Sequence, residues 1–326
     1  MNLLHGPTLR QQTRQALEQA SYCPRRLTLI HTAGLVLLSV LQWAAVYFLS
    51  RQIASTGGLA GIKMRSYLET AQTVLPLILT VLSLFWEFGL TKGALQIARQ
   101  EDCGPHTLAE GFRRFGPCLR LMLLEYVVTL AVVMLAMQAA MVVFTLTPLS
   151  QPLMAQLESL SASLESLDEA AAQTLVLELA TSADVIPLYC LFALGLLGFG
   201  APVFYRLRLT TFLILDKPGT GALAAMKGSL MLTRGNCLAL FRIDLQFWWY
   251  YGLQILIAAT AFADVALSAM GVSVPISADG LSFLLLSIQC VCQLALFTCF
   301  RSRVLTTYAT AYLNLLPPAP ATTPAE

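Results

Sequence analysis

The residues of this sequence that could do chemistry are ionisable side chains inside long apolar segments. Glu87 lies deepest, in an apolar run that also contains Lys92. A charge in hydrocarbon is costly, so an intramembrane carboxylate is a functional-site hypothesis by default, and such groups act as proton relays in many transporters. The candidate intramembrane polar site consists of Glu87, Lys92, Glu125, Arg206, Arg242 and Asp244.

Two interpretations of these charges stay open. In the first, the three carboxylates neutralise Lys92, Arg206 or Arg242 and lock the helices together. In the second, Glu87 lines a water-reached cavity open to the cytoplasm and binds a proton or a cation. Helical geometry puts Lys92 about 140 degrees around the helix from Glu87, so the two are poor partners. The same geometry groups Glu87 on one polar face with Thr73, Thr80, Ser83 and Thr91.

Motifs of soluble enzymes are missing from the sequence. It contains no His-Glu-x-x-His, no Gly-x-Ser-x-Gly and no glycine-rich phosphate loop. None of the eight cysteines has metal-ligand spacing, since Cys290 and Cys292 are one residue apart with no histidine nearby. We therefore expect no enzymatic activity, no metal and no cofactor, and reduced cysteines that behave as small apolar residues.

Composition indicates what surrounds these charges. The 326 residues are 57% apolar and only 12% charged, and the mean hydropathy is +0.69. Soluble domains carry about 25% charged residues. The soluble, disordered, collagenous and disulfide-scaffold classes are therefore excluded, and an all-α polytopic membrane protein remains.

Six apolar segments are long enough to cross a bilayer, which requires about 20 residues. The 23-residue first segment has no small-residue cleavage site after it, so we interpret it as a retained anchor and not a signal peptide. The predicted spans are Leu27–Leu49, Val74–Ala98, Leu119–Leu146, Val185 to about Leu209, about Leu245 to Ala263, and Leu281–Phe300. A Pro202 break beside Gly198 and Gly200 in the fourth is the only hint of the broken helices that transporters use.

Basic residues predict the orientation, because they resist translocation. Of the twenty Lys and Arg residues, sixteen fall on one side of the six spans, Arg51, Lys63 and Arg65 on the other, and Lys92 inside a span. Both termini are therefore expected in the cytoplasm. The predicted divisions are a cytoplasmic amphipathic lead-in (1–26), a six-helix membrane domain (27–313) and a disordered cytoplasmic tail (314–326).

Two loops of the membrane domain have distinctive patterns. The outer loop, 148–184, contains acidic residues and no basic one, and its leucines follow helical spacing. This predicts an extracytoplasmic amphipathic helix between the third and fourth spans. The helix either packs on itself or, through residues 150–180, binds a protein partner or a second copy. The inner segment 216–236 is bounded by Pro and Gly and predicts a short interfacial helix.

Three parts of the chain resemble a known family. They are Leu9–Leu17, the stretch from Glu87-Phe-Gly89 to Glu110-Gly-Phe-Arg-Arg-Phe115, and the stretch from Phe212-Leu-Ile-Leu-Asp-Lys-Pro218 to Trp248. They are similar to the uncharacterised bacterial integral membrane family called domain of unknown function 975, although Gln246 departs from that pattern.

The resemblance implies six helices in a bacterial cytoplasmic membrane and no assigned activity. It implies that Glu87, Gly89, Asp216, Pro218 and Gly235 belong to the family pattern. Asp216 would act at a turn or helix start, where its carboxylate can accept hydrogen bonds from free backbone amides. Gly89 is also separated by four residues from Gly93, a spacing that permits close helix contact.

The function expected from the sequence is a non-enzymatic membrane protein that acts through lipids or a protein partner. Its contact surfaces would be the acidic outer helix and the basic inner loops, which phospholipid headgroups explain better than nucleic acid does. The alternative is a small-solute or ion transporter that uses Glu87. A third alternative, an intramembrane enzyme, has no visible nucleophile, base or metal set to support it.

Overall fold

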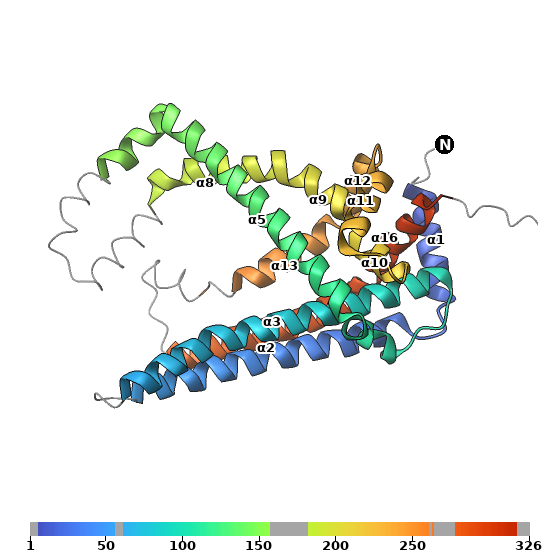
Figure 1. Ribbon diagram of the computed structural model, residues 1–326, viewed down its shortest axis with the longest axis horizontal. Coiled ribbons are helices and arrows are strands. Elements are labelled where there is room, and N and C mark those ends of the chain that lie inside the picture. Colours follow the sequence, from blue (N-terminus) through green and yellow to red (C-terminus); the bar gives the residue numbers. More distant parts are fainter. Residues whose placement is uncertain (1–5, 56–60, 157–181, 261–262, 264–277, 318–326) are drawn as a thin grey trace, which may run out of the picture. The chain divides into compact units, whose positions relative to one another are not determined.

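The computed structural model describes residues 6–55, 61–156, 182–260, 263 and 278–317 (Figure 1). Within these ranges every regular element is a helix and no strand occurs, so the expected all-α class is confirmed for them. The chain divides into two compact units, residues 1–119 with 209–326 (unit 1) and residues 120–208 (unit 2). The leucine pattern of the outer loop falls at 157–181 and most of the tail at 318–326, outside the described residues.

Five helices are long and apolar enough to cross a membrane. At a rise of 1.5 Å per residue, a helix of 30 residues is about 45 Å long, more than the roughly 30 Å of a hydrocarbon core. A multi-pass membrane protein is compatible with this finding. The helices are Pro24–Ile53, Ser66–Arg99, Phe115–Leu146, Ile186–Asp216 and Gly280–Leu315, which match the first four predicted spans and the sixth.

Unit 1 is organised around one long helix, α3 (Gly61–Arg99). This helix packs along α2 (Pro24–Ser55), and also against α10 (Thr210–Asp216) and α16 (Ser302–Leu315) (Figure 1). The other elements of unit 1 are α1 (Gly6–Glu18), η1 (Pro105–Ala109), α4 (Glu110–Arg113), α11 (Ala222–Thr233), α12 (Cys237–Gln246), α13 (Trp248–Ala259), α15 (Ala278–Leu296) and the π-helical turn η6 (Phe297–Arg301).

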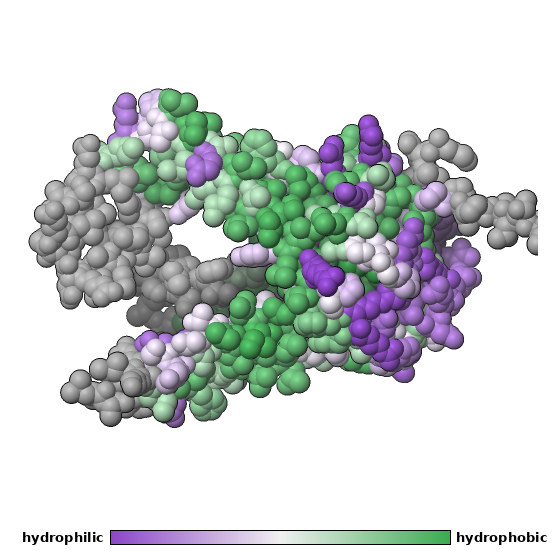
Figure 2. Space-filling view, viewed as in Figure 1, coloured by the Kyte–Doolittle hydropathy of each residue, from purple (hydrophilic) through white to green (hydrophobic). Residues whose placement is uncertain are grey.

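The protein core of unit 1 gathers at the Arg99 end of α3. There α3 buries Phe85, Leu90 and Leu95, and α10 buries nearly its whole length. The rest of α2 and α3 presents large apolar side chains outward, and Leu37 is 69% exposed. Figure 2 shows hydrophobic surface over the middle of these two helices and hydrophilic side chains around α1 and α16. Surrounding lipid would explain why these apolar side chains of α2 and α3 are exposed, because exposing them to water costs free energy.

The predicted fifth span is interrupted near its start. Helix α12 ends at Gln246, and Phe247, with φ −112° and ψ 18°, separates it from α13. The apolar helix of this segment begins at Trp248, three residues after the expected start at about Leu245. The 12 residues of α13 extend for about 18 Å, too short to cross a bilayer alone. A sixth span over 245–263 stays a prediction.

A helix does form within the inner segment 216–236. Helix α11 packs on α10 through small residues such as Ala222, Ala225 and Ser229. The larger Leu223 and Met231 are exposed. Gly235 follows α11 with φ 80°, a left-handed backbone conformation that residues other than glycine rarely adopt. An outward row of large apolar residues suits a helix at a membrane surface.

Unit 2 contains most of α5 (Phe115–Leu146), followed by η2 (Pro148–Ser150), η3 (Ala183–Val185), α8 (Ile186–Gly195), the π-helical turn η4 (Leu196–Gly200) and α9 (Ala201–Leu207). Gly195 brings α8 close to α5, because an added Cβ would lie 3.1 Å from the Ala136 carbonyl oxygen. The expected break at Pro202 is wrong. The backbone instead stays helical through the π-helical turn η4 and into Ala201, with φ −56° and ψ −47°.

Candidate functional site

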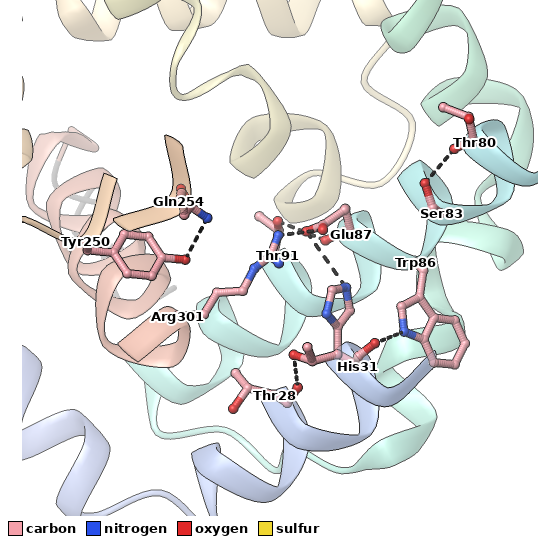
Figure 3. Close-up of polar contacts among 11 residues, drawn as sticks. Thr28, His31, Thr80, Ser83, Trp86, Glu87, Thr91, Tyr250, Gln254 and Arg301 are labelled. Carbon is pink, nitrogen blue, oxygen red and sulfur yellow. Dashed lines mark hydrogen bonds and ion pairs between the residues drawn. The ribbon is translucent and has the colours of Figure 1, made fainter. Parts of the chain in front are cut away.

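Glu87 lies at a meeting point of three helical elements (Figure 3). Arg301, at the end of η6, places its Nη2 atom 2.5 Å from the Glu87 Oε1 atom. His31, on α2, places its Nε2 atom 3.8 Å from Glu87 Oε2. We call these three residues the Glu87 cluster. Together they hold one carboxylate, one guanidinium and one imidazole, a set that can share or transfer a proton.

Local sequence positions each member of the cluster. Glu87 is on the stretch of α3 that lies between the buried residues Phe85 and Leu90, so its carboxylate is held close to the core. Arg301 comes four residues after Phe297, and its guanidinium carbon lies 4.4 Å from the centre of that ring. Cation–π contact of this kind fixes a guanidinium and lowers its need for water.

His31 is the most enclosed member. Its side chain is fully buried, and within the described residues neither ring nitrogen has a hydrogen-bond partner. Trp86 stacks near the imidazole, with ring centres 6.3 Å apart, and its indole Nε1 donates to the His31 carbonyl oxygen at 3.0 Å. The ring is therefore oriented by packing. In the neutral imidazole one nitrogen can accept a proton, and either nitrogen can hydrogen-bond a water molecule.

The hydroxyls on the predicted polar face of α3 do not extend the cluster. Thr80 donates to the Pro76 carbonyl, Ser83 to the Thr80 carbonyl and Thr91 to the Glu87 carbonyl. Each hydroxyl is thus satisfied by the backbone of its own helix. The hydroxyl residues do occur at the expected positions along α3. Their hydroxyl groups, however, already donate to backbone carbonyls and are not directed to the Glu87 carboxylate.

Two of the predicted partners of Glu87, Lys92 and Arg242, do not pair with it. Its cation is Arg301, whereas Lys92 Nζ lies 3.4 Å from the Leu215 carbonyl oxygen and donates there. Arg242 is exposed on α12 and outside the five long helices. Asp244, also on α12, accepts hydrogen bonds from the hydroxyls of Tyr251 (2.7 Å) and Tyr308. Glu125 and Arg206 belong to unit 2.

A second polar cluster surrounds the end of α10. Arg114 Nη1 donates to the carbonyls of Ile214 (3.3 Å) and Leu215 (3.0 Å), the latter shared with Lys92. Cations at this end of a helix satisfy its free carbonyls and complement its dipole. Arg99 Nη2 lies 2.6 Å from Asp216 Oδ1, and the Tyr312 hydroxyl donates to Asp216 Oδ2 at 2.8 Å. We call Lys92, Arg99, Arg114, Asp216 and Tyr312 the α10 clamp.

Asp216 therefore does not have the expected role. It is the last residue of α10, not the start of a helix, and its side chain is only 5% exposed. The carboxylate binds Arg99 and Tyr312, from α3 and α16, in place of local backbone amides. The turn itself is made next, where Pro218 precedes Gly219 (φ 87°) and the Thr220 N–H donates to the Lys217 carbonyl at 3.2 Å.

Gly89 and Gly93 of α3 do permit close contacts. A Cβ on Gly89 would lie 2.1 Å from the Leu108 carbonyl oxygen of η1, and one on Gly93 would lie 2.7 Å from Leu27 Cδ2 of α2. Gly89 thus lets η1 approach the helix at the level of the Glu87 cluster. Close approach was expected from the spacing, but one of the two neighbours is a short turn and not a long helix.

Metal-binding clusters of three or more His, Cys, Asp or Glu residues do not occur in the described part of the chain. The cysteines in it are free thiols. Burial raises the pKa of the Cys103 thiol, which lies in the loop after α3. A buried neutral thiol is a poor metal ligand and a slow nucleophile.

Comparison of the chain with protein-family models, with curated proteins and with solved structures finds no match. The similarity to domain of unknown function 975 therefore stays a prediction made from the residues quoted above.

Proposed function

We propose that this chain is a six-span membrane protein with both termini in the cytoplasm, and that it acts without catalysis through contacts with lipids or a protein partner. One observation carries the proposal. Two carboxylates are paired with arginines inside unit 1, Glu87 with Arg301 and Asp216 with Arg99, and these pairs join α3 to η6 and to α10. Charges matched in this way act as internal fasteners.

Several basic side chains are left exposed for contacts with other molecules. Arg25, Arg242 and Arg303 are exposed, and none of them makes an ion pair within the described residues. Cytoplasmic leaflets carry anionic lipids, which attract exposed basic residues. The bias of sixteen basic residues to one side supports the same orientation. The resemblance described above supports a bacterial cytoplasmic membrane as the location.

Flux measurements test the proposal. The protein is reconstituted into vesicles that enclose a pH-sensitive dye, a proton gradient is imposed, and wild type is compared with Glu87→Gln. We expect both to leak protons no faster than empty vesicles, with an ionophore as the positive control. Proton movement that wild type supports and Glu87→Gln abolishes would overturn the proposal.

Thiol labelling tests the orientation. A cysteine placed at Ser161 should react with a membrane-impermeant maleimide added to intact cells, whereas Cys23, which is exposed on the side proposed to be inner, should react only after lysis. The reverse pattern would contradict the proposed topology.

A transporter that uses Glu87 is the second candidate, and one observation favours it. His31 has two ring nitrogens without hydrogen-bond partners in the described residues, and one of them lies 3.8 Å from Glu87. Such a pair can exchange a proton if water reaches it. The flux experiment above separates the two candidates.

A further inference from the structure

Two adjoining hollows in unit 1 lie beside α1 and the start of α16. The smaller also borders the junction of α12 and α13, and the larger also borders the start of α2. Their volumes are about 200 Å³ and about 570 Å³. Both are lined by Phe300 and Arg303, so one guanidinium faces both spaces. The Glu87 cluster contributes no residue to either hollow.

Arginine dominates the lining of the two hollows. Arg10 and Arg303 line the smaller, and Arg14, Arg25 and Arg303 line the larger, where Glu18 is the only acid. Glu18 is engaged by Arg14 at 2.7 Å. Arg10 Nε donates to Gln246 Oε1 at 2.8 Å, a neutral partner that leaves its charge uncompensated.

Arg25 and Arg303 are the least satisfied of these residues. Both are exposed, and neither side chain makes a hydrogen bond or ion pair within the described ranges. Guanidinium groups are planar forks that bind phosphate oxygens in pairs. Arg25 also lies in the first turn of the 32-residue α2, where the helix dipole adds further positive potential. The larger hollow thus suits a phosphate group.

The surroundings of the hollows favour a lipid over a soluble anion. Phe300 is 36% exposed and meets the Trp249 ring edge-on, with ring centres 4.6 Å apart. Leu29, one turn along α2 from Arg25, is also exposed, and the apolar surface continues from there along the helix. Aromatic rings beside basic groups are typical of the level at which lipid headgroups meet acyl chains.

We propose that the larger hollow binds the phosphate group of an anionic glycerophospholipid from the surrounding leaflet. Arg25 and Arg303 hold the phosphate, and Phe300 and Trp249 contact the glycerol and the first acyl carbons. The inference rests on the proposed function, because it names a lipid class and a site for the contacts suggested there.

Competition binding tests the proposal on the full-length protein in neutral detergent micelles. The probe is fluorescently labelled phosphatidylglycerol, and the competitors are unlabelled phosphatidylglycerol, phosphatidylcholine and inorganic phosphate. We expect displacement by phosphatidylglycerol at least about tenfold more readily than by phosphatidylcholine. The double variant Arg25→Gln/Arg303→Gln should bind the probe at least about tenfold more weakly, as expected for two basic residues near an anionic surface.

Arg26→Gln is the matched control for Arg25→Gln alone, because each removes one positive charge from neighbouring exposed positions and Arg26 lines neither hollow. Arg26→Gln should bind the probe like wild type, and Arg25→Gln more weakly. The variant Arg25→Lys/Arg303→Lys keeps both positive charges but removes the planar guanidinium groups, so it should bind the probe with intermediate strength. An equal loss in Arg26→Gln and Arg25→Gln, or no preference for phosphatidylglycerol, would refute the site. Displacement by millimolar phosphate as effective as by the lipid would mean a soluble anion and also refute it.

Failure of this inference and failure of the proposed function are distinguishable. If Glu87-dependent flux is found but the lipid preference depends on Arg25 and Arg303, the lipid site stands and the non-transport function falls. If no flux is found and the lipid preference is absent, the lipid site falls and the contact function must operate through a protein partner.

Discussion

The Glu87 cluster and the α10 clamp both set a carboxylate against an arginine, but they differ in how completely their polar groups are matched. In the clamp, Asp216 is 5% exposed and uses both oxygens, and the last carbonyls of α10 receive Arg114 and Lys92. In the Glu87 cluster the carboxylate is 31% exposed, and the His31 ring has no hydrogen-bond partner among the described residues.

This difference indicates that the two clusters connect the helices in different ways. The Asp216 carboxylate is nearly dry and both of its oxygens are bonded, so it fixes α10 against α3 and α16, and losing Arg99 leaves this buried charge without a cation. The Glu87 cluster keeps unused hydrogen-bonding capacity and some access to solvent. It can therefore accept a proton or a water molecule at a lower cost in stability.

The largest effect should come from opening the clamp. Arg99→Met leaves the Asp216 carboxylate with Tyr312 alone, so we expect the free energy of unfolding to fall by about 3 kcal/mol. Thermal unfolding of the solubilised protein measures the change. Arg113→Met is the control, since its 3.6 Å ion pair with Glu110 is largely exposed and should contribute little. An equal unfolding temperature for Arg99→Met and wild type would contradict the proposed stabilising role of the α10 clamp.

A smaller loss should follow from Arg301→Met. Glu87 is then left unpaired, but because it is partly exposed it can take up water or a proton, and we expect a loss of about 2 kcal/mol. Adding Glu87→Gln to this variant removes the stranded charge and should restore most of the stability. The same unfolding measurement applies, and a double variant as unstable as Arg301→Met would show that the pair is not the cause.

Single hydrogen bonds should separate the two sites further. Tyr312→Phe removes one donor to Asp216, for an expected cost of about 1 kcal/mol. His31→Leu removes no hydrogen bond within the described residues, and the free energy of unfolding should change by less than about 1 kcal/mol. A clearly larger loss for His31→Leu than for Tyr312→Phe would mean that the imidazole is bonded to something else, such as an internal water.

The smallest effect concerns the reactivity of the loop thiol. Because burial raises the pKa of Cys103, less of it is thiolate at pH 8 than for an ordinary cysteine, and its maleimide rate should keep rising as the pH passes the ordinary thiol range. With single-cysteine variants, the exposed Cys23 should react faster than Cys103. Cys103 follows Arg99 closely, so its labelling should accelerate in Arg99→Met and not in Arg301→Met. No difference between these two backgrounds would argue against a local opening.

Glu87 could be identified from the sequence, whereas its partner could not. A carboxylate within an apolar helix differs in polarity from the residues next to it in the chain, and this contrast can be read from a short stretch of sequence. Arg301 stands at the end of an apolar run, where arginine is expected to meet lipid headgroups, so nothing in its surroundings marked it as the cation for Glu87. His31 gave no signal either, because a histidine near a helix end is ordinary.

Asp216 illustrates the opposite error. Aspartate before Lys-Pro is typical of a turn, and a turn does follow α10, but the carboxylate binds Arg99 and Tyr312 from distant parts of the chain. Local propensity describes the backbone near a residue. It carries no information about which remote side chain will lie within hydrogen-bond distance.

The sequence by itself determined the helical class and the position of the apolar helices, because solubility in hydrocarbon and helix length are properties of contiguous residues. Only the tertiary structure decided that Glu87 meets Arg301 and His31, and that Lys92, Arg99 and Arg114 hold the end of α10. Those pairings depend on how separate helices pack, and in lipid the packing is directed by close backbone approach at residues such as Gly89 and by the matching of charges across the whole chain.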